Sequence, residues 1–145
     1  MKTIWIRQSD EAFAEWLSLR EKVLRLPLGL SYSADDLREE ADDRHLLSYL
    51  DGKLAGGLVV REVGDDGLAW KVRQVAVAPE LQGKGIGRKL MLAVEEKARE
   101  EGVCELVLHS RGEVVPFYEA IGFCAEGEPF VEVGIPHRRM RKRLS

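Results

Sequence analysis

Hydrophobic and polar positions in the first third of the chain follow first a strand-like and then a helical period. Alternation over residues 3–8 predicts a first strand. Asp10 can cap a helix over residues 11–25, because the apolar residues there recur at helical spacing. The segment PLGLSYS interrupts this pattern, and a short acidic helix is expected near residues 34–42.

The middle of the chain returns to strand-like segments separated by turn residues. The turn signals are Gly52-Lys53 and the segment GDDG, and turns of this length join antiparallel neighbours. Three strands are therefore predicted, at residues 45–51, 54–63 and 68–79.

Beyond Pro79 the spacing of apolar residues changes to that of a long amphipathic helix. Apolar residues recur every four positions from Ile86 to Ala98, and Gly102 is a candidate C-terminal cap. The segment CELVLHS (104–110) predicts a buried parallel strand, EVVPFYEAIGF a short helix that ends at Gly122, and CAEGEP and HRRMRKRL two final strands.

The order β-α-α-β-β-β-α-β-α-β-β predicts an α/β (α+β) protein. We expect a mixed, largely antiparallel sheet of six to seven strands, flanked by about four helices. At 145 residues, without repeats or linkers, the chain is expected to form a single domain over 1–145.

Composition changes this picture little. The chain is 45% hydrophobic and 32% charged, as in ordinary globular proteins, and its net charge of −3 argues against nucleic-acid binding. Five of the last nine residues are basic, which indicates either a solvated edge strand, the favoured interpretation, or a docking patch.

Several features favour a cytoplasmic protein. Nothing resembles a signal peptide, and no apolar run has the length of a membrane span. Cys104 and Cys124 stand far apart and outside any metal-ligand spacing, so we expect reduced core cysteines and no metal site.

The segment QGKGIG (82–87) is the strongest candidate for ligand binding. It lies between a predicted strand and a predicted helix, whose first N–H groups lack partners and carry the positive end of the dipole. Glycines expose such N–H groups without a Cβ in the way, and Lys84 and Arg88 add positive charge. A phosphate or pyrophosphate is the expected ligand.

Two common phosphate-binding loops do not match this segment. The glycines are spaced G-x-G-x-G, whereas the dinucleotide fingerprint requires G-x-G-x-x-G. A P-loop requires a glycine where Ala78 stands and a serine or threonine where Gly85 stands.

The pattern Q-x-x-G-x-G after the strand VRQVAV instead resembles the acyl-CoA-binding segment of the GCN5-related N-acetyltransferase (GNAT) superfamily. The strand LVLHSR followed by PFYEAIGF is similar to a second signature of that superfamily, at its usual distance. The ending F-V-E-V-G-I-P-H-x-x-M is similar to a group of small bacterial members. The resemblance runs from about residue 53 to the C-terminus.

This resemblance implies acetyl-CoA as the cosubstrate and specifies where it is held. The main chain of the strand before the turn would pair with the pantetheine arm, and the turn would hold the pyrophosphate. Where many relatives have an asparagine that touches the cofactor arm, this chain has an arginine, which is able to reach a phosphate. The implied binding residues are Val75, Ala76, Val77, Gln82, Gly83, Lys84, Gly85, Ile86, Gly87, Arg88, Arg111 and Tyr118.

Tyr118 matches the position of the superfamily's usual general acid, near the sulfur of coenzyme A. The alternative is a half-buried aromatic residue of an amphipathic helix. A tyrosine titrates near 10 and a thiol near 8.5, so full proton transfer to the thiolate is uphill by about 2 kcal/mol. Hydrogen bonding to the developing negative sulfur is therefore the expected role.

An amine must be neutral to attack the thioester, so a base is expected. A lysine-like amine of pKa ~10.4 is neutral in about one molecule of 2,500 at pH 7, which corresponds to about 4.6 kcal/mol. We rank His137 and Glu132 first as bases, because the G-I-P-H loop should border the acceptor. Glu126, Glu128 and His109 remain as alternatives.

The sequence thus predicts direct transfer of an acetyl group to a primary amine, with a small molecule as the favoured acceptor. Alternatives are a CoA-binding sensor or interaction module without catalysis, and an acetyltransferase of protein amino groups. Arg20 and Arg25 either recognise a carboxylate of the acceptor or are exposed helix residues. No membrane or nucleic-acid partner is expected, and a homodimer is compatible with such folds.

Overall fold

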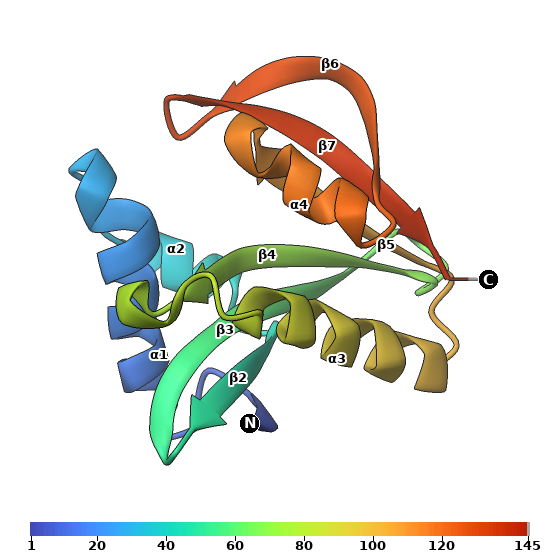
Figure 1. The fold of residues 1–145 in the computed structure, drawn as a ribbon. Coiled ribbons are helices and arrows are strands. Elements are labelled where there is room, and N and C mark those ends of the chain that lie inside the picture. The colour runs from blue at the N-terminus through green and yellow to red at the C-terminus, as the bar shows by residue number, and fades with distance from the viewer. Residues whose placement is uncertain (145) are drawn as a thin grey trace. The chain divides into compact units, whose positions relative to one another are not determined.

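The structure is a computed structural model that describes residues 1–144, drawn as a ribbon in Figure 1. Its strands are β1 (Lys2–Ile6), β2 (Arg44–Leu50), β3 (Lys53–Val63), β4 (Ala69–Val77), β5 (Glu105–Arg111), β6 (Cys124–Glu132) and β7 (Ile135–Arg143). Its α-helices are α1 (Phe13–Arg20), α2 (Ala34–Glu39), α3 (Ile86–Glu100) and α4 (Val115–Ala120). Short helical turns are η1 (Glu21–Arg25), η2 (Leu26–Leu28), η3 (Pro79–Leu81) and η4 (Gly112–Val114).

The strands form one seven-stranded mixed sheet in the order β1-β2-β3-β4-β5-β7-β6. β4 and β5 run parallel, with Ala69–Val72 aligned to Glu105–Leu108, whereas β1 with β2, β2 with β3, β5 with β7 and β6 with β7 are antiparallel. Seven strands and four α-helices confirm the predicted fold class, including the parallel strand after the long helix.

The packing of the chain divides it into two compact units. Unit 1 comprises Met1–Arg61 and Arg73–Val94, and unit 2 comprises Glu62–Val72 and the residues from Glu95 onward. The single domain over 1–145 stays a prediction, and each unit is described by itself.

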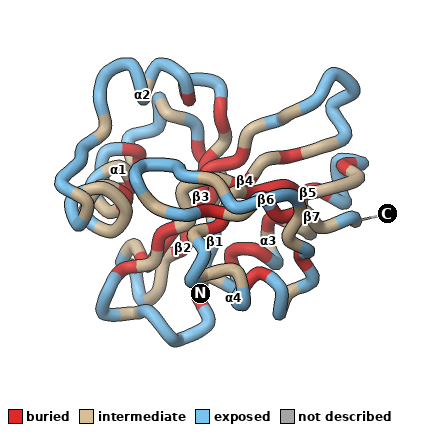
Figure 2. The backbone as a smooth tube through the Cα atoms, turned by 90° about the horizontal axis from the view of Figure 1, so that it is seen from above, coloured by how far each residue is buried: buried red, intermediate tan, exposed pale blue. Residues whose placement is uncertain are grey.

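The core of unit 1 is built on α1 and the strands that it covers. Trp16 is fully buried among side chains from β1, β2, β3 and β4. Its ring requires a glycine in β3, because a Cβ at Gly57 would lie 2.9 Å from the indole and 2.9 Å from the carbonyl oxygen of Leu46. The red buried stretches of β2 and β3 in Figure 2 follow this core.

The residue of β3 directly before Gly57 meets the amphipathic helix α3. A Cβ at Gly56 would lie 2.7 Å from the carbonyl oxygen of Ala76 and 3.4 Å from Leu90 of α3. Since neighbouring strand residues point to opposite faces, α1 and the first half of α3 cover opposite faces of this part of the sheet. The two glycines thus allow close packing on both faces.

In unit 2, apolar residues of β5 and β7 are buried together with the end of α4. Leu106, Leu108 and Met140 are almost fully buried, as is Phe123 after α4. The ammonium of Lys142 in β7 reaches Glu95 at 2.8 Å and donates to the carbonyl oxygen of Ile121 at 2.8 Å.

Three local predictions require correction. The segment predicted as one helix over 11–25 is an α-helix to Arg20 and a π-helical turn over Glu21–Arg25. The final two strands are longer than predicted and meet at a turn formed by Val133 and Gly134, which both have positive φ. Period-2 alternation is weak in FVEVGIP, so no pattern of hydrophobic residues predicted this extension.

The basic C-terminal segment is not an edge strand. β7 lies between β5 and β6 in the sheet. Its arginines are tolerated there because carboxylates on neighbouring strands pair with them: Arg139 with Glu126 at 2.9 Å, and Arg141 with Glu105 at 3.1 Å.

Candidate functional site

The glycine-rich turn of unit 1 connects β4 to α3, as the sequence predicts. The hydrogen-bond ladder of α3 begins with the N–H of Lys89, which donates to the carbonyl oxygen of Gly85 at 3.1 Å. The N–H groups of Ile86, Gly87 and Arg88 precede this bond and form the positive end of a helix of 15 residues.

Backbone conformation explains the glycines of this turn. Gly83 and Gly85 have φ of 80° and 81°, values that other residues rarely adopt. A Cβ at either position would meet no atom within 4 Å, so the glycines are required by conformation and not by crowding. Both positions are exposed, and the backbone of the turn is open to a ligand.

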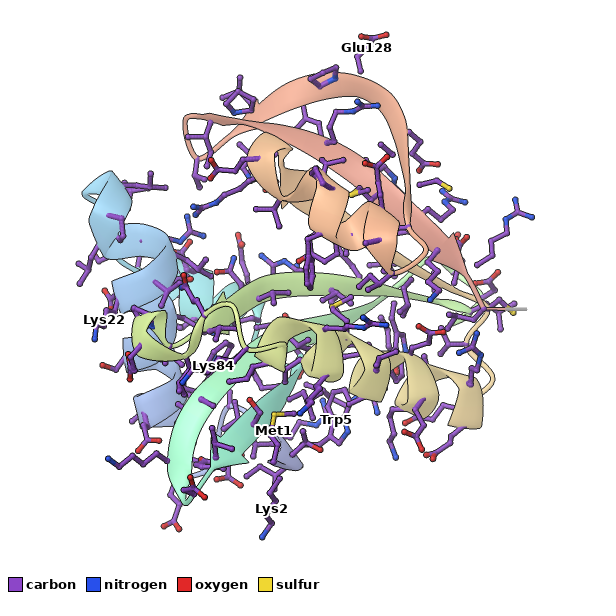
Figure 3. All side chains as sticks on the ribbon, in the orientation of Figure 1. Met1, Lys2, Trp5, Lys22, Lys84 and Glu128 are labelled. Atoms are coloured by element: carbon purple, nitrogen blue, oxygen red, sulfur yellow. The ribbon has the colours of Figure 1, made fainter. Side chains whose placement is uncertain are left out.

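Two side chains fix the turn to the rest of unit 1. The Nε2 of Gln82 donates to the carbonyl oxygen of Val77 at 3.1 Å, which joins the turn to the end of β4. Ile86 is 5% exposed and anchors the first turn of α3. Lys84 and Arg88 are exposed, and Figure 3 shows Lys84 on the turn. The arrangement can bind an anion through backbone N–H groups and two cationic side chains.

The strand before the turn is irregular near its end. Gln74 has a φ of 56°, in the left-handed region, although it stands inside β4. The ladder between β4 and β5 ends at Val72 and Leu108, so Val75, Ala76 and Val77 lie past its end. The main chain of these three residues is therefore not used in that ladder.

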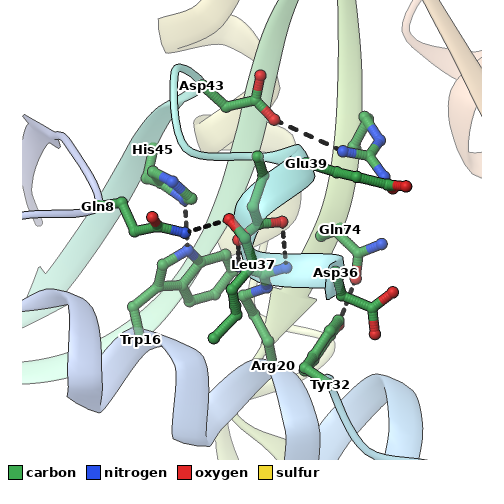
Figure 4. Close-up of polar contacts among 12 residues, drawn as sticks. Gln8, Trp16, Arg20, Tyr32, Asp36, Leu37, Glu39, Asp43, His45 and Gln74 are labelled. Carbon is green, nitrogen blue, oxygen red and sulfur yellow. Dashed lines mark hydrogen bonds and ion pairs between the residues drawn. The ribbon is translucent and has the colours of Figure 1, made fainter. Parts of the chain in front are cut away.

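A polar network in unit 1 holds Gln74 and the segment between α1 and α2. The hydroxyl of Tyr32 donates to the side-chain oxygen of Gln74, as Figure 4 shows. The Tyr32 ring lies 4.5 Å from the guanidinium carbon of Arg20 and 4.8 Å from that of Arg25. The network thus connects the irregularity of β4 to the π-helical turn.

Arg20 is neither exposed nor available to an acceptor. It is fully buried, and its two terminal nitrogens bind Glu40 at 2.7 and 2.9 Å. Burial alone would lower the pKa of Arg20, but the hydrogen bonds and charge of Glu40 raise it above its ordinary value.

Tyr118 of unit 2 lies in α4 and is 7% exposed. Its ring makes edge contacts with Phe117 and Phe123, with centroids 5.0 and 5.7 Å apart. Burial raises the pKa of Tyr118 to about 12. Against a thiol near 8.5, full proton transfer is uphill by about 5 kcal/mol, so the buried hydroxyl can act only as a hydrogen-bond donor.

The two residues ranked first as bases lie together in unit 2, with one of the alternatives. The carboxylate of Glu132 is 3.1 Å from Nδ1 of His109 and 3.6 Å from Nε2 of His137. The Nδ1 of His137 lies 2.9 Å from the carbonyl oxygen of Ile135, which can only accept, so this nitrogen carries the proton. In neutral His137, Nε2 is therefore the atom able to accept a proton.

The surroundings of this group keep Glu132 ionised. Burial by itself would raise the pKa of Glu132, but the hydrogen bond with His109 and the charges of His109, His137 and Lys71 hold it below its usual range. Phe130 stacks on the His137 ring at 6.1 Å and contacts the His109 ring edge-on at 4.9 Å.

The other two candidate bases have different surroundings. Glu126 pairs with Arg139 and with Arg141, and these hydrogen bonds lower its pKa. Glu128 is exposed and points away from β6 in Figure 3. Arg111 ends β5 opposite His137, and its expected contact with a phosphate stays a prediction.

The cysteines are free, as expected, but they are not core residues, since Cys104 is half-buried and Cys124 is exposed. In residues 1–144, no group of three or more His, Cys, Asp or Glu side chains is arranged to hold a metal ion. Every helix in this described part of the chain is too short or too polar to cross a membrane.

Sequence reasoning missed the contact of Tyr32 with Gln74 and the separate charged group of Asp43, Arg61 and Arg73. These residues come from separate segments, and no spacing rule connects Asp43 with an arginine 18 positions later. No feature of the sequence predicted the left-handed conformation of Gln74, because glycine or asparagine is the usual residue in that conformation.

Comparisons with known proteins show which family and fold this chain resembles. A family model described as "Acetyltransferase (GNAT) domain" matches residues 30–144. A Bacillus subtilis protein assigned as an acetyltransferase is 30% identical over 102 residues, which are 70% of this chain and 67% of that protein.

Solved structures share the fold. The crystal structure of a Lactobacillus plantarum protein assigned as an N-acetyltransferase has a TM-score of 0.87 at 25% identity and covers 99% of this chain and 98% of its own. An aminoglycoside 6'-N-acetyltransferase complexed with coenzyme A has a TM-score of 0.79 and covers 100% and 98%. At 14% identity it shows similarity of fold alone.

Proposed function

The chain belongs to the acetyltransferase (GNAT) family, and from this premise we propose that it transfers an acetyl group from acetyl-CoA to the primary amine of a small molecule. The family match crosses both compact units, which supports treating residues 1–145 as one functional domain.

The observation that carries the proposal is the turn between β4 and α3. Positive φ at Gly83 and Gly85, the start of the α3 ladder at Lys89, and the exposed Lys84 and Arg88 together make an anion site. This site fits a pyrophosphate. The complex of a similar fold with coenzyme A supports the choice of a CoA thioester as the ligand.

The strand that precedes the turn would bind the rest of the cosubstrate. Val75, Ala76 and Val77 lie past the end of the ladder between β4 and β5, so their backbone groups are suited to bind an extended amide-containing arm. A backbone N–H near Val77 would stabilise the negative charge that develops on the carbonyl oxygen during attack by the amine.

Acetyl-CoA supplies an activated acetyl group, and the side chains of this chain manage protons and charge. Tyr118 donates a hydrogen bond to the developing thiolate without transferring its proton fully, because its pKa is about 12. The Nε2 of His137 accepts the proton of the amine, directly or through water, and Glu132 at 3.6 Å stabilises the imidazolium that forms.

The anion site of the turn between β4 and α3, here called the cradle, is tested by calorimetric titration. The two ligands are acetyl-CoA and S-acetylpantetheine, which lacks the pyrophosphate. Wild-type protein should bind acetyl-CoA more tightly. Gly85→Val should weaken acetyl-CoA binding by at least about tenfold, since valine disfavours the φ of 81° that aligns the N–H groups.

Gly67→Val is the matched control, because Gly67 has a φ of 71°, open space around its Cβ and a position outside the turn. This control should leave acetyl-CoA affinity unchanged. Equal affinities of wild-type and folded Gly85→Val protein for acetyl-CoA would overturn the assignment of the cradle.

A further inference from the structure

Unit 1 contains a cluster of charged side chains close to the irregular part of β4. Asp43 is 5% exposed, and Arg61 of β3 occupies both of its carboxylate oxygens. The Nε of Arg61 lies 3.0 and 3.2 Å from the two oxygens, and Nη2 lies 2.9 Å from one of them. This geometry is a bidentate pair, which satisfies the charge and the acceptor sites of Asp43.

The second carboxylate of the cluster is also paired with an arginine. Glu40 is 3% exposed and binds both terminal nitrogens of Arg20, as described above. Asp43 and Glu40 therefore each have one arginine, Arg61 and Arg20 respectively, as their main partner.

Arg73 is the third arginine of the cluster, and it has no carboxylate of its own. Its Nη1 lies 3.6 Å from Asp43 and is buried without a hydrogen-bond partner among residues 1–144. The side chain as a whole is 25% exposed, so part of it is open to solvent although Nη1 is buried. Burial and the neighbouring Arg61 lower the pKa of Arg73, because both disfavour its cationic form.

The balance of charge in the cluster favours an incoming anion. Arg20, Arg61 and Arg73 face two carboxylates, so Arg73 shares Asp43 with Arg61 and has only the long ion pair of 3.6 Å. Partly buried cations are strongly stabilised by a hydrogen-bonded anion and poorly stabilised without one. The structure of unit 1 itself supplies no such anion to Arg73 within hydrogen-bonding distance among the described residues.

The position of Arg73 relates this charge to the proposed reaction. It directly precedes Gln74, whose conformation interrupts β4, and it lies two residues before the backbone proposed to hold the cosubstrate arm. A group bound at Arg73 would therefore lie near the carbonyl of the acetyl group, at a distance that a few residues of extended chain span.

We propose that Arg73 binds an anionic group of the acceptor, a carboxylate or a phosphate, so that the preferred acceptors carry both an amine and an anion. This inference rests on the proposed acetyl transfer and adds the chemical class of the acceptor. Arg73 acts by binding and has no part in moving protons.

The test uses matched pairs of amines that differ only in the anion. Glycine, β-alanine and γ-aminobutyrate are compared with their carboxamides, and O-phosphoethanolamine with ethanolamine, which separates carboxylate from phosphate. Binding of each compound to protein saturated with CoA is measured by calorimetry. Acetylation of each compound is measured in parallel with acetyl-CoA.

Wild-type protein should bind at least one anionic amine about 10- to 100-fold more tightly than its neutral partner, as expected for a hydrogen bond between charged groups. Arg73→Gln should reduce this preference to within about twofold, and Arg73→Lys should retain part of it. Because Asp43 keeps Arg61, both variants should fold, which thermal melting checks.

Lys22→Gln is the matched control, since it removes one positive charge from an exposed position of unit 1 (Figure 3). The control should keep the full preference. Equal binding of anionic and neutral amines to the wild type, or a preference that persists in Arg73→Gln, would overturn the role of Arg73. Absence of acetylation with a preserved binding preference would instead count against acetyl transfer while supporting the anion site.

Discussion

At the scale of single residues, burial decides what Tyr118 is able to contribute. The sequence predicted its place after β5, and the structure adds that the hydroxyl is in an apolar setting with a pKa of about 12. A phenol of this kind is a hydrogen-bond donor at any physiological pH. Its contribution should appear in catalysis and not in the binding of acetyl-CoA.

We predict that Tyr118→Phe lowers kcat by about 100-fold, because the hydrogen bond to the leaving sulfur is lost. Affinity for acetyl-CoA and the melting temperature should stay close to those of the wild type, since the aromatic contacts with Phe117 and Phe123 are kept. Steady-state kinetics and calorimetry check both parts. A variant with unchanged kcat would exclude the proposed role.

Site residues that belong to a short sequence motif were predictable from the sequence. Residues that come together only through folding were not. The glycines of the turn and Tyr118 stand in short patterns, so their positions could be specified in advance. Glu132 and His137 were ranked first as bases because of the loop, and the structure brings them to 3.6 Å. Arg73 and Asp43 come together only through the folding of separate segments. The periodicity of the sequence does not predict such a tertiary contact.

At the scale of elements, packing explains features that propensity does not. Glycine is unfavourable inside strands, yet β3 contains Gly56 and Gly57. Each stands where a neighbouring element approaches too closely for a Cβ. By contrast, the helix over residues 86–100 was predicted almost to its ends, because its apolar residues follow one helical face.

Gly57→Ala should lower the free energy of unfolding by about 1–3 kcal/mol, as overpacking of a core does. The added methyl group would lie 2.9 Å from both Trp16 and the backbone of β2, and the backbone cannot move away easily. Urea unfolding measures the effect. Gly112→Ala is the comparison for packing, since Gly112 has no positive φ and its Cβ would meet only the carbonyl oxygen of Pro136, at 3.9 Å; a Gly57→Ala loss no larger than that of Gly112→Ala would contradict this account.

At the scale of the whole molecule, a buried histidine makes stability depend on pH. His45 is fully buried, and its Nδ1 accepts a hydrogen bond from the indole of Trp16 at 3.0 Å (Figure 4). Burial lowers the pKa of His45 to about 4, below its ordinary value of 6.5. The unfolded chain therefore binds a proton at His45 over a range of pH in which the folded protein does not.

Stability from this group is complete above about pH 6.5 and falls as the pH decreases toward about 4. The loss is about 2 kcal/mol at pH 5 and about 3 kcal/mol at pH 4. We predict that His45→Gln, which keeps an acceptor for Trp16 without a titrating ring, shows a shallower decline between pH 7 and pH 4.5. Identical slopes of unfolding free energy against pH for the two proteins would contradict the assignment.

The central claim also concerns the whole molecule: the chain transfers an acetyl group from acetyl-CoA directly to an amine. The most direct measurement is mass spectrometry of a panel of amines incubated with the protein and acetyl-CoA, with free CoA thiol counted in the same samples. The account predicts N-acetylated amine and CoA in equal amounts, no acetylated protein, and retained activity in the double variant Cys104→Ala, Cys124→Ala. Tight binding of acetyl-CoA without any acetylated amine would contradict it and indicate a CoA-binding module.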